Sequence, residues 1–237
     1  MNLVTSKELG AQLLSTHPVV TLRLADTWKA ARTWNDAFLD DPMITYLRAG
    51  EKPRSTSNRV AVTVVLALWM QSKVVLTVNG GAALIVASPV QTGSPPIERL
   101  ADILINWIAT AAQKLGTAEQ KKRNKETKEK IAKVTALVLG DRVNEMLYVS
   151  LLATEPQSQG QGLGSALLET VTSYADILGQ SAWLVSSNVL NTGFYNSHGF
   201  KTVGEAYLGD DNSEWHQVPV IIRIVSSSQL NLIWFNE

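Results

Sequence analysis

The chain has 237 residues, of which 45% are hydrophobic and 18% charged, so it can bury one substantial core. Lys and Arg together number 21, as do Asp and Glu, so no overall electric field favours nucleic acid or an anionic membrane as a partner. Cysteine is absent, which excludes disulfides, thiolate catalysis and cysteine metal sites.

The first residues lack the apolar core of a signal peptide and the arginines of a transit peptide, so an intracellular, cytoplasmic location is expected. The most apolar segment, 60–70, is about half of the roughly 20 residues that cross a bilayer, and Arg59 and Lys73 flank it. We therefore assign it to the core and expect no membrane association.

Apolar patterning in the first part of the chain predicts a strand over 19–24, a helix over 26–38, a buried helix over 58–71, and strands over 74–78 and 82–87. The β-branched content of 58–71 leaves a strand open as the alternative. Pro42 cannot continue the helix before it, so Asp40-Asp41-Pro42 is expected to be a turn. Asn79-Gly80-Gly81 between two apolar runs predicts a hairpin.

Prolines make 88–96 a loop, and a helix over 97–115 is expected to end at Gly116. Thr117 and Gln120 form a capping box that begins a second helix, which reaches about Leu139. The segment 117–133 carries seven basic and three acidic residues. Such a segment could hold an acidic partner or the ribose phosphate of a cofactor, but it is more typical of a solvated helix face. Because no aromatic residues lie among the basic ones, nucleic-acid binding is not favoured.

The most informative stretch follows a strand over 146–153 and opens a helix over 163–178: Gln159-Gly160-Gln161-Gly162-Leu163-Gly164-Ser165. Glycines before a helix present bare backbone N–H groups at the positive end of its dipole, which favours phosphate. The lysine of a P-loop is missing, and so is the acidic ribose ligand that a dinucleotide fingerprint has about 20 residues further on. Beyond the helix, a strand over 182–186, a short helix over 191–197, and strands over 201–205 and 218–225 are expected.

A second motif turns this weak signal into a specific one. Gln159-x-x-Gly162-x-Gly164 resembles the Q/R-x-x-G-x-G/A signature of the GNAT superfamily of N-acetyltransferases. The segment 188–200 resembles that family's N-x-x-A-x-x-F/L-Y-x-x-x-G-F motif, with Asn188, Phe194, Tyr195, Gly199 and Phe200 in register, although Asn191 replaces the usual small residue. The strong resemblance covers 146–206. Segments 37–42, 204–205 and 215–223 look like a fungal-type subset.

The resemblance implies an α/β fold of the α+β type, in which helices flank a mixed, mostly antiparallel sheet. It also implies a single domain over 1–237 with a helical insertion around 97–139. The implied reaction is direct transfer of an acetyl group from acetyl-CoA to a primary amine, without a covalent enzyme intermediate. The implied cofactor-binding residues are Leu151, Leu152, Ala153 and Thr154, then Gln159, Gly160, Gln161, Gly162, Leu163, Gly164 and Ser165, and finally Asn188 and Tyr195.

By the same resemblance, Tyr195 is the general acid that protonates the departing thiolate, although packing against Phe194 and Phe200 is the alternative. Glu145 and Glu155 flank the central strand and are the weak candidates for the base; a water chain is another route. Three scattered histidines predict no metal site. A non-catalytic acyl-CoA-binding or protein-interaction module is the alternative function, and the amine acceptor and the oligomeric state stay open.

Overall fold

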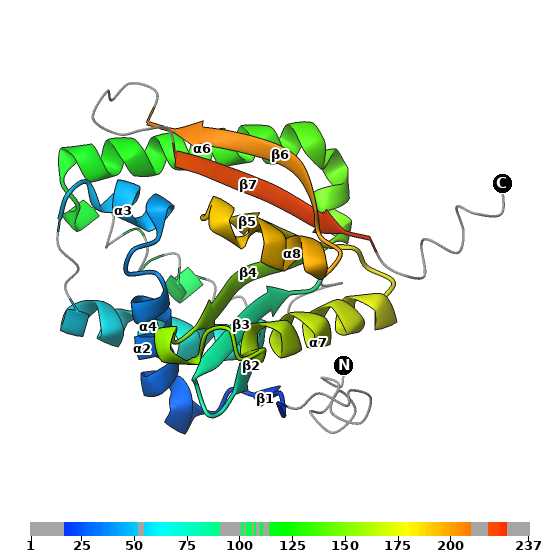
Figure 1. Ribbon diagram of the computed structural model, residues 1–237. Coiled ribbons are helices and arrows are strands. Elements are labelled where there is room, and N and C mark those ends of the chain that lie inside the picture. The colour runs from blue at the N-terminus through cyan, green and yellow to red at the C-terminus, as the bar shows by residue number, and fades with distance from the viewer. Residues whose placement is uncertain are drawn as a thin grey trace, which may run out of the picture.

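The computed structural model describes residues 17–51, 55–90, 101, 103–105, 107, 110, 114–209 and 218–226. Within these residues seven strands form one sheet in the order β1-β2-β3-β4-β5-β7-β6 (Figure 1). Neighbouring strands are antiparallel except for β4 and β5, which are parallel. The mixed, mostly antiparallel sheet predicted from the sequence is therefore confirmed.

The strands are β1 (Val20–Thr21), β2 (Val74–Val78), β3 (Ala83–Ser88), β4 (Leu147–Thr154), β5 (Ala182–Ser186), β6 (Lys201–Leu208) and β7 (Val218–Val225). The helices are α2 (Thr27–Ala37), α3 (Pro42–Arg48), α4 (Ser55–Ser72), α6 (Ala118–Val138), α7 (Leu163–Ile177) and α8 (Thr192–Ser197). Short 3-10 turns lie at η1 (Leu24–Asp26), η2 (Gly140–Glu145), η3 (Pro156–Ser158) and η4 (Val189–Asn191).

Most predicted elements are present within a few residues, and the predicted helix over 97–115 lies largely outside the described residues. The segment 58–71 is helical as predicted, so the strand alternative is wrong. One prediction needs correction. Asp40-Asp41-Pro42 is not merely a turn, because Pro42 begins α3. The Asp41 side chain accepts a hydrogen bond from the Ile44 amide at 3.0 Å, and proline at the first helical position needs no amide partner. The predicted loop 88–96 and Trp215 lie largely or wholly outside the described residues.

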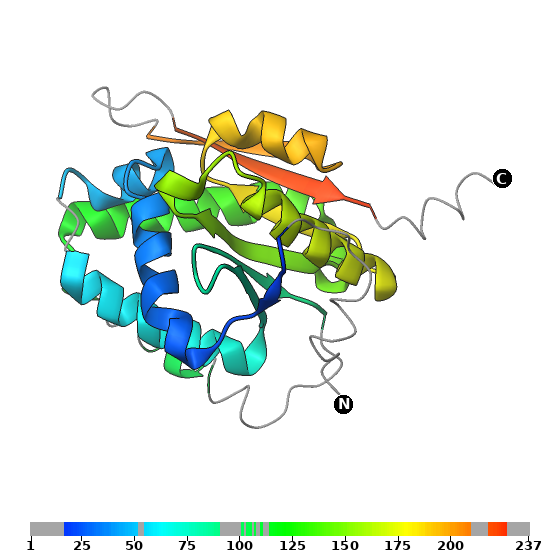
Figure 2. The same cartoon turned by 60° about the horizontal axis from the view of Figure 1, so that its bottom comes forward.

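Helices cover both faces of the sheet (Figures 1 and 2). On one face α7 and α8 pack their apolar side chains against β2, β3, β4 and β5, in a cluster that contains Leu167, Val171 and Phe200. On the other face α2 and α4 cover β2, β3 and the end of β4. Further along that second face, α3 and α6 pack on β6 and β7. Such burial on both faces is what the nearly continuous apolar runs of the central strands require.

A β-bulge reverses the faces of β4 half-way along its length. Val86 pairs with Leu151 and Ala87 with Val149, so Ser150 is the extra residue. Before the bulge Leu147 and Val149 pack with α7, whereas after it Leu151 packs with α2 and α4. One inserted residue shifts the alternation of side chains by one position and increases the local twist of the strand.

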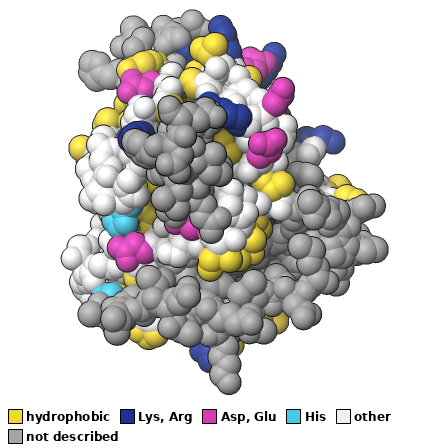
Figure 3. All heavy atoms as spheres, turned by 90° about the vertical axis from the view of Figure 1, so that its right-hand side faces the viewer, with side chains coloured by type: hydrophobic (Ala, Val, Ile, Leu, Met, Phe, Trp, Pro, Cys, Tyr) yellow, Lys and Arg dark blue, Asp and Glu magenta, His cyan; other side chains and the backbone are white. Residues whose placement is uncertain are grey.

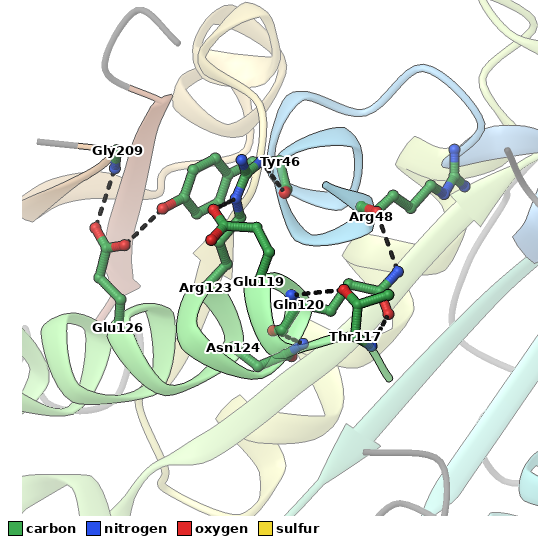
Figure 4. Close-up of polar contacts among 9 residues, drawn as sticks. All are labelled: Tyr46, Arg48, Thr117, Glu119, Gln120, Arg123, Asn124, Glu126 and Gly209. Carbon is green, nitrogen blue, oxygen red and sulfur yellow. Dashed lines mark hydrogen bonds and ion pairs between the residues drawn. The ribbon is translucent and has the colours of Figure 1, made fainter. Parts of the chain in front are cut away.

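The helix α6, inside the predicted insertion, is fixed to α3 by a half-buried polar network (Figure 4). The predicted capping box is confirmed, because Thr117 and Gln120 exchange hydrogen bonds of 3.0 and 3.2 Å. Further along α6, Glu126 accepts hydrogen bonds from the Tyr46 hydroxyl at 2.5 Å and from the Gly209 amide at 3.0 Å. Arg123 donates to the Tyr46 carbonyl at 2.9 Å and to Glu119 at 2.6 Å.

The described residues on the face at the right of Figure 1 mix acidic, basic and apolar side chains (Figure 3). No large area of one charge is visible among them, which agrees with the balanced composition of the chain. Within the described part of the chain, no helix has both the length and the apolar character needed to cross a membrane.

Candidate functional site

The site begins where the two central parallel strands separate. The pairing of β4 with β5 runs from Leu147 with Ala182 to Val149 with Leu184 and then stops. On its other edge β4 stays paired with β3 as far as Thr154. Because the bulge at Ser150 lies where the separation starts, its added twist gives a physical reason for β4 turning away from β5. Residues 151–154 of β4 therefore have main-chain groups at a sheet edge without a neighbouring strand.

The glycine loop leaves the end of β4 and opens α7 with its main-chain amides unused. Gly160 and Gly162 have φ values of 73° and 84°, which side chains with a Cβ rarely adopt. Among the described residues, none of the N–H groups of 160–165 donates a hydrogen bond; the first helical bond is from Ala166 to the Gly162 carbonyl, at 3.0 Å. No side chain caps α7. The arrangement is a nest of free donors at a helix N-terminus, as anion binding requires.

The two glutamine side chains of the loop turn back on the protein. Gln159 donates to the Thr154 carbonyl at 3.2 Å, and Gln161 donates to the Gln157 carbonyl at 3.0 Å. His17 lies beside the same loop, with Nε2 2.8 Å from the Gln161 carbonyl oxygen. Sequence reasoning missed this contact, because nothing local links a histidine to a loop more than a hundred residues away. These contacts fix the backbone of the loop rather than occupy its amides.

A cavity of about 710 Å³ joins the open edge of β4 to the glycine loop. Of the thirteen cofactor-binding residues predicted from the sequence, eleven line it: Leu152, Ala153, Thr154, Gln159, Gly160, Gly162, Leu163, Gly164, Ser165, Asn188 and Tyr195. Leu151 is instead buried in the core toward α2 and α4, as its position after the bulge requires. Gln161 also lies outside the lining.

Tyr195 lies on α8 and lines this cavity, with 9% of its surface exposed. Its ring packs edge-on against Phe194 and Phe200, at centroid distances of 5.2 and 5.9 Å. Its hydroxyl has no hydrogen-bond partner among the described residues. Burial raises the pKa of the Tyr195 phenol to about 12, with the positive charge of Arg223 opposing this rise and the negative charge of Asp41 adding to it. Tyr195 therefore both packs against Phe194 and Phe200 and lines the cavity.

Asn188 and Asn191 bring the second motif to the same cavity. The Asn188 carbonyl accepts from the Ser186 hydroxyl at 3.0 Å, and its side-chain oxygen caps η4 by accepting from the Leu190 amide at 2.9 Å. Asn191, which departs from the motif, makes no capping hydrogen bond to α8. Both amide side chains thus lie among the lining residues on the β5 side of the opening.

Three aspartates at the end of α2, between the two helices and at the N-cap of α3 also line the cavity: Asp36, Asp40 and Asp41. Asp41 is buried and engaged, because it accepts from the Ile44 amide at 3.0 Å and from the Ser187 hydroxyl at 2.6 Å. Asp36 pairs with Arg32 at 3.2 Å. Asp40 is exposed and has no hydrogen-bond or ion-pair partner among the described residues.

The structure places the two glutamates proposed as bases differently. Glu145 ends η2 and precedes β4, so an eight-residue strand separates it from the glycine loop. At about 3.3 Å per residue that strand is on the order of 26 Å long. Glu155 follows Thr154 directly but is absent from the cavity lining, and it accepts a hydrogen bond from Ser158 at 2.9 Å. Within the described residues, no three His, Asp or Glu side chains lie close enough together to hold a metal ion.

Comparison with known proteins gives a family match over part of the chain and several similar solved structures. Residues 107–202 match the family described as "Acetyltransferase (GNAT) domain", a range that includes β4, the glycine loop, α7, β5 and α8. Arylalkylamine N-acetyltransferase 2 from Aedes aegypti is similar in structure, with a TM-score of 0.60 and 16% identity over 90% of this chain and 99% of its own. The chain has the GNAT fold.

Two further solved structures share the GNAT fold. Polyamine N-acetyltransferase from Drosophila melanogaster has a TM-score of 0.55 and 15% identity, over 89% of this chain and 99% of its own. A Corynebacterium glutamicum protein described as "histone acetyltransferase HPA2 and related acetyltransferase" has a TM-score of 0.55 and 17% identity, over 90% of this chain and 98% of its own. Comparison with curated protein sequences gives no match. At these identities the shared property is the fold.

Proposed function

We propose that this protein is an N-acetyltransferase that moves an acetyl group from acetyl-CoA to a primary amine. The observation that carries the proposal is one cavity in which the unpaired edge of β4, the free amides of residues 160–165 and Tyr195 meet. The pyrophosphate of acetyl-CoA fits the amides, because they are donors at the positive end of α7. Its pantetheine arm fits the edge of β4, because an amide chain pairs there like an added strand.

In the proposed reaction the amine nitrogen attacks the thioester carbonyl directly. The N–H group of Leu152 stabilises the oxyanion of the tetrahedral intermediate, and holding both reactants in one cavity removes much of the entropic barrier. The C–S bond then breaks, and the sulfur receives a proton from the Tyr195 hydroxyl. The amine loses its proton through a carboxylate or through water.

We propose Asp40 as the carboxylate that holds the acceptor ammonium group. Asp36 and Asp41 have partners of their own, whereas Asp40 lines the cavity without one among the described residues. The named substrates of two similar structures, an arylalkylamine and a polyamine, are amines, which supports an amine as acceptor here. Glu155, next to Thr154, is the remaining candidate for the base. Membership of a fungal-type subset is a further proposal, supported among the described residues by 37–42, 204–205 and 218–223.

The first test replaces Tyr195 by Phe. Purified protein is assayed for free CoA release with a panel of primary amines, and acetyl-CoA binding is measured by titration calorimetry. We expect kcat to fall about 100-fold, since general acid catalysis contributes factors of this size, with an unchanged dissociation constant for acetyl-CoA. Acetyl-CoA binding without CoA release for any amine would favour the alternative, a non-catalytic acyl-CoA-binding or interaction module. Absence of acetyl-CoA binding would contradict both the acetyltransferase and the acyl-CoA-binding module, and would leave only the interaction module.

The second test concerns the acceptor. Asp40→Asn is expected to raise KM for a cationic diamine about threefold to fivefold, as expected for the loss of one exposed charge pair, while KM for acetyl-CoA stays unchanged. Asp141→Asn, an exposed substitution on η2 outside the cavity lining, is the matched control. Equal amine KM values for the two variants would remove Asp40 from acceptor binding.

A further inference from the structure

Arg223 on β7 is a fully buried cation directly behind the proposed general acid. Its exposed fraction is 0%, and its Cζ lies 5.5 Å from the centre of the Tyr195 ring. Neighbouring residues of β7, Ile222 and Ile224, pack toward α6, so the alternation of the strand turns Arg223 to the face that carries α8. The alternation of side chains along β7 therefore places the guanidinium of Arg223 next to Tyr195.

The hydrogen bonds of Arg223 attach the helix of Tyr195 to the sheet. Its guanidinium donates to the Thr192 hydroxyl at 2.7 Å and to the Asn196 side-chain oxygen at 3.3 Å, both on α8. A third bond, of 2.9 Å, reaches the Thr202 hydroxyl on β6. Thr192 and Asn196 flank Tyr195 along the helix, so these contacts fix the rotation and depth of α8 at this residue.

All three acceptors are neutral. Among the described residues no carboxylate lies within ion-pair distance of Arg223, and its Nε has no hydrogen-bond partner. Burial accordingly lowers the pKa of Arg223, with Tyr195 and Glu205 acting in the opposite direction. A buried cation without a counter-ion is costly to the fold. A purely structural anchor for α8 does not need that charge, because a neutral amide can bond to hydroxyls equally well.

We infer that Arg223 is a positioning residue that holds Tyr195 in the cavity and stabilises the phenolate formed when Tyr195 gives up its proton. This inference rests on the proposed acetyl transfer. As the C–S bond breaks, the proton moves from the Tyr195 oxygen to the sulfur, and a negative charge appears on the phenol beside the guanidinium. The charged groups around this pair are Asp41 at the start of α3, which opposes the phenolate, and Glu205 on β6, which faces Arg223. Reprotonation of Tyr195 by solvent completes the cycle.

A double-mutant cycle on the full chain separates a catalytic role from a structural one. Arg223→Met is expected to lower kcat about tenfold, as expected for a neighbouring charge that shifts a phenol by about one pKa unit, with KM for acetyl-CoA unchanged. In the Tyr195→Phe background the same substitution is expected to have no further effect on kcat, because the phenolate is no longer formed. An equal loss of kcat in both backgrounds would overturn the inference.

Two further variants keep the test decisive if Arg223→Met unfolds. Arg223→Lys preserves the charge and is expected to retain most of kcat; Thr202→Val removes one anchor but keeps the charge and is expected to behave like wild type. A more acidic fluorotyrosine at position 195 is expected to restore kcat to Arg223→Met, or to Arg223→Gln in its place. Failure of this rescue, in a variant whose circular dichroism and acetyl-CoA affinity match wild type, would also overturn the inference. Wild-type protein that transfers no acetyl group would contradict the proposed function instead.

Discussion

Two glycines of the loop, Gly162 and Gly164, differ in whether they tolerate a side chain. Gly162 has a φ of 84°, so any side chain there is strained. Gly164 has no such φ, and a Cβ added to it lies 3.5 Å from the Thr154 hydroxyl oxygen and 3.6 Å from Phe194, which are ordinary contacts. This difference agrees with the family motif, which allows glycine or alanine at the position of Gly164. The two positions make a matched pair.

We predict that Gly162→Ala weakens acetyl-CoA binding about tenfold and destabilises the fold by about 1–2 kcal/mol, because the loop must hold a left-handed alanine or move its amides. Gly164→Ala is the control and is expected to be neutral or to stabilise by up to about 1 kcal/mol, since it adds a good helix former to the first turn of α7. Calorimetric titration with acetyl-CoA and urea denaturation measure both effects. Equal losses in the two variants would show that backbone conformation is not the cause.

At the scale of elements, α6 holds α3 in place, and α3 carries Asp41 at its start. Glu126 on α6 accepts a hydrogen bond from the Tyr46 hydroxyl of α3 (Figure 4). It also forms an ion pair of 3.0 Å with Lys130. Burial alone raises the pKa of Glu126, but the hydrogen bonds from Tyr46 and the Gly209 amide, together with Lys130, outweigh it and lower that pKa below its usual value. A helix outside the strongest motif match thus supports one wall of the cavity.

We predict that Glu126→Gln lowers the free energy of unfolding by about 1–2 kcal/mol at neutral pH, the usual worth of hydrogen bonds to a charged group. A pKa lowered by folding stabilises the protein above the unfolded-state value, and this contribution is lost as the pH falls through the folded-state value. The difference between wild type and variant should therefore shrink below about pH 4. Glu129→Gln, at an exposed position 3.9 Å from Lys125, is the control and should cost less than about 0.5 kcal/mol.

Urea denaturation at a series of pH values provides the measurement. A difference between wild type and Glu126→Gln that stays constant down to pH 3 would show that the Glu126 carboxylate is not the stabilising species. A loss in Glu129→Gln as large as that in Glu126→Gln would assign the effect to the charge of α6 rather than to the contact with Tyr46.

At the scale of the whole molecule, the sheet consists of two parts joined along a short seam. Strands β1 to β4 form one part, and β5, β7 and β6 form the other, with three residue pairs of β4 and β5 between them. The bond from Ser187 to Asp41, at 2.6 Å, links the chain after β5 to the start of α3, which packs on β6 and β7. A ligand along the open edge of β4 therefore bridges the two parts of the sheet.

We predict that acetyl-CoA slows amide hydrogen exchange most at 160–165 and at those residues of 152–154 whose N–H groups point away from β3, because it supplies the acceptors that these amides lack. At about 100 times its dissociation constant it should also add about 2.7 kcal/mol to the free energy of unfolding. Exchange mass spectrometry and thermal unfolding, with desulfo-CoA as a ligand lacking the thioester, measure both effects. Protection confined to α6 would mean that the cofactor binds elsewhere.

The sequence determined the elements and the chemistry of the loop, because both depend on local patterns. The capping box at Thr117 and the helix after Gly162 were predicted for local reasons, and so was the hairpin at Asn79. Helix α3 was missed although proline after aspartate is also the pattern of a helix start, since the same dipeptide fits a turn. Local patterns of this kind leave such choices open.

Only the tertiary structure decided which residues share the cavity. The apolar run 146–153 gave no sign that Ser150 is a bulge that turns Leu151 into the core and opens the edge of β4. Local patterns also could not indicate that Arg223 lies behind Tyr195, or that Asp40 lines the same cavity as Tyr195, because these residues belong to elements far apart in the chain. Sequence periodicity fixes which face of an element is buried, whereas strand register and the packing of elements fix what that face meets.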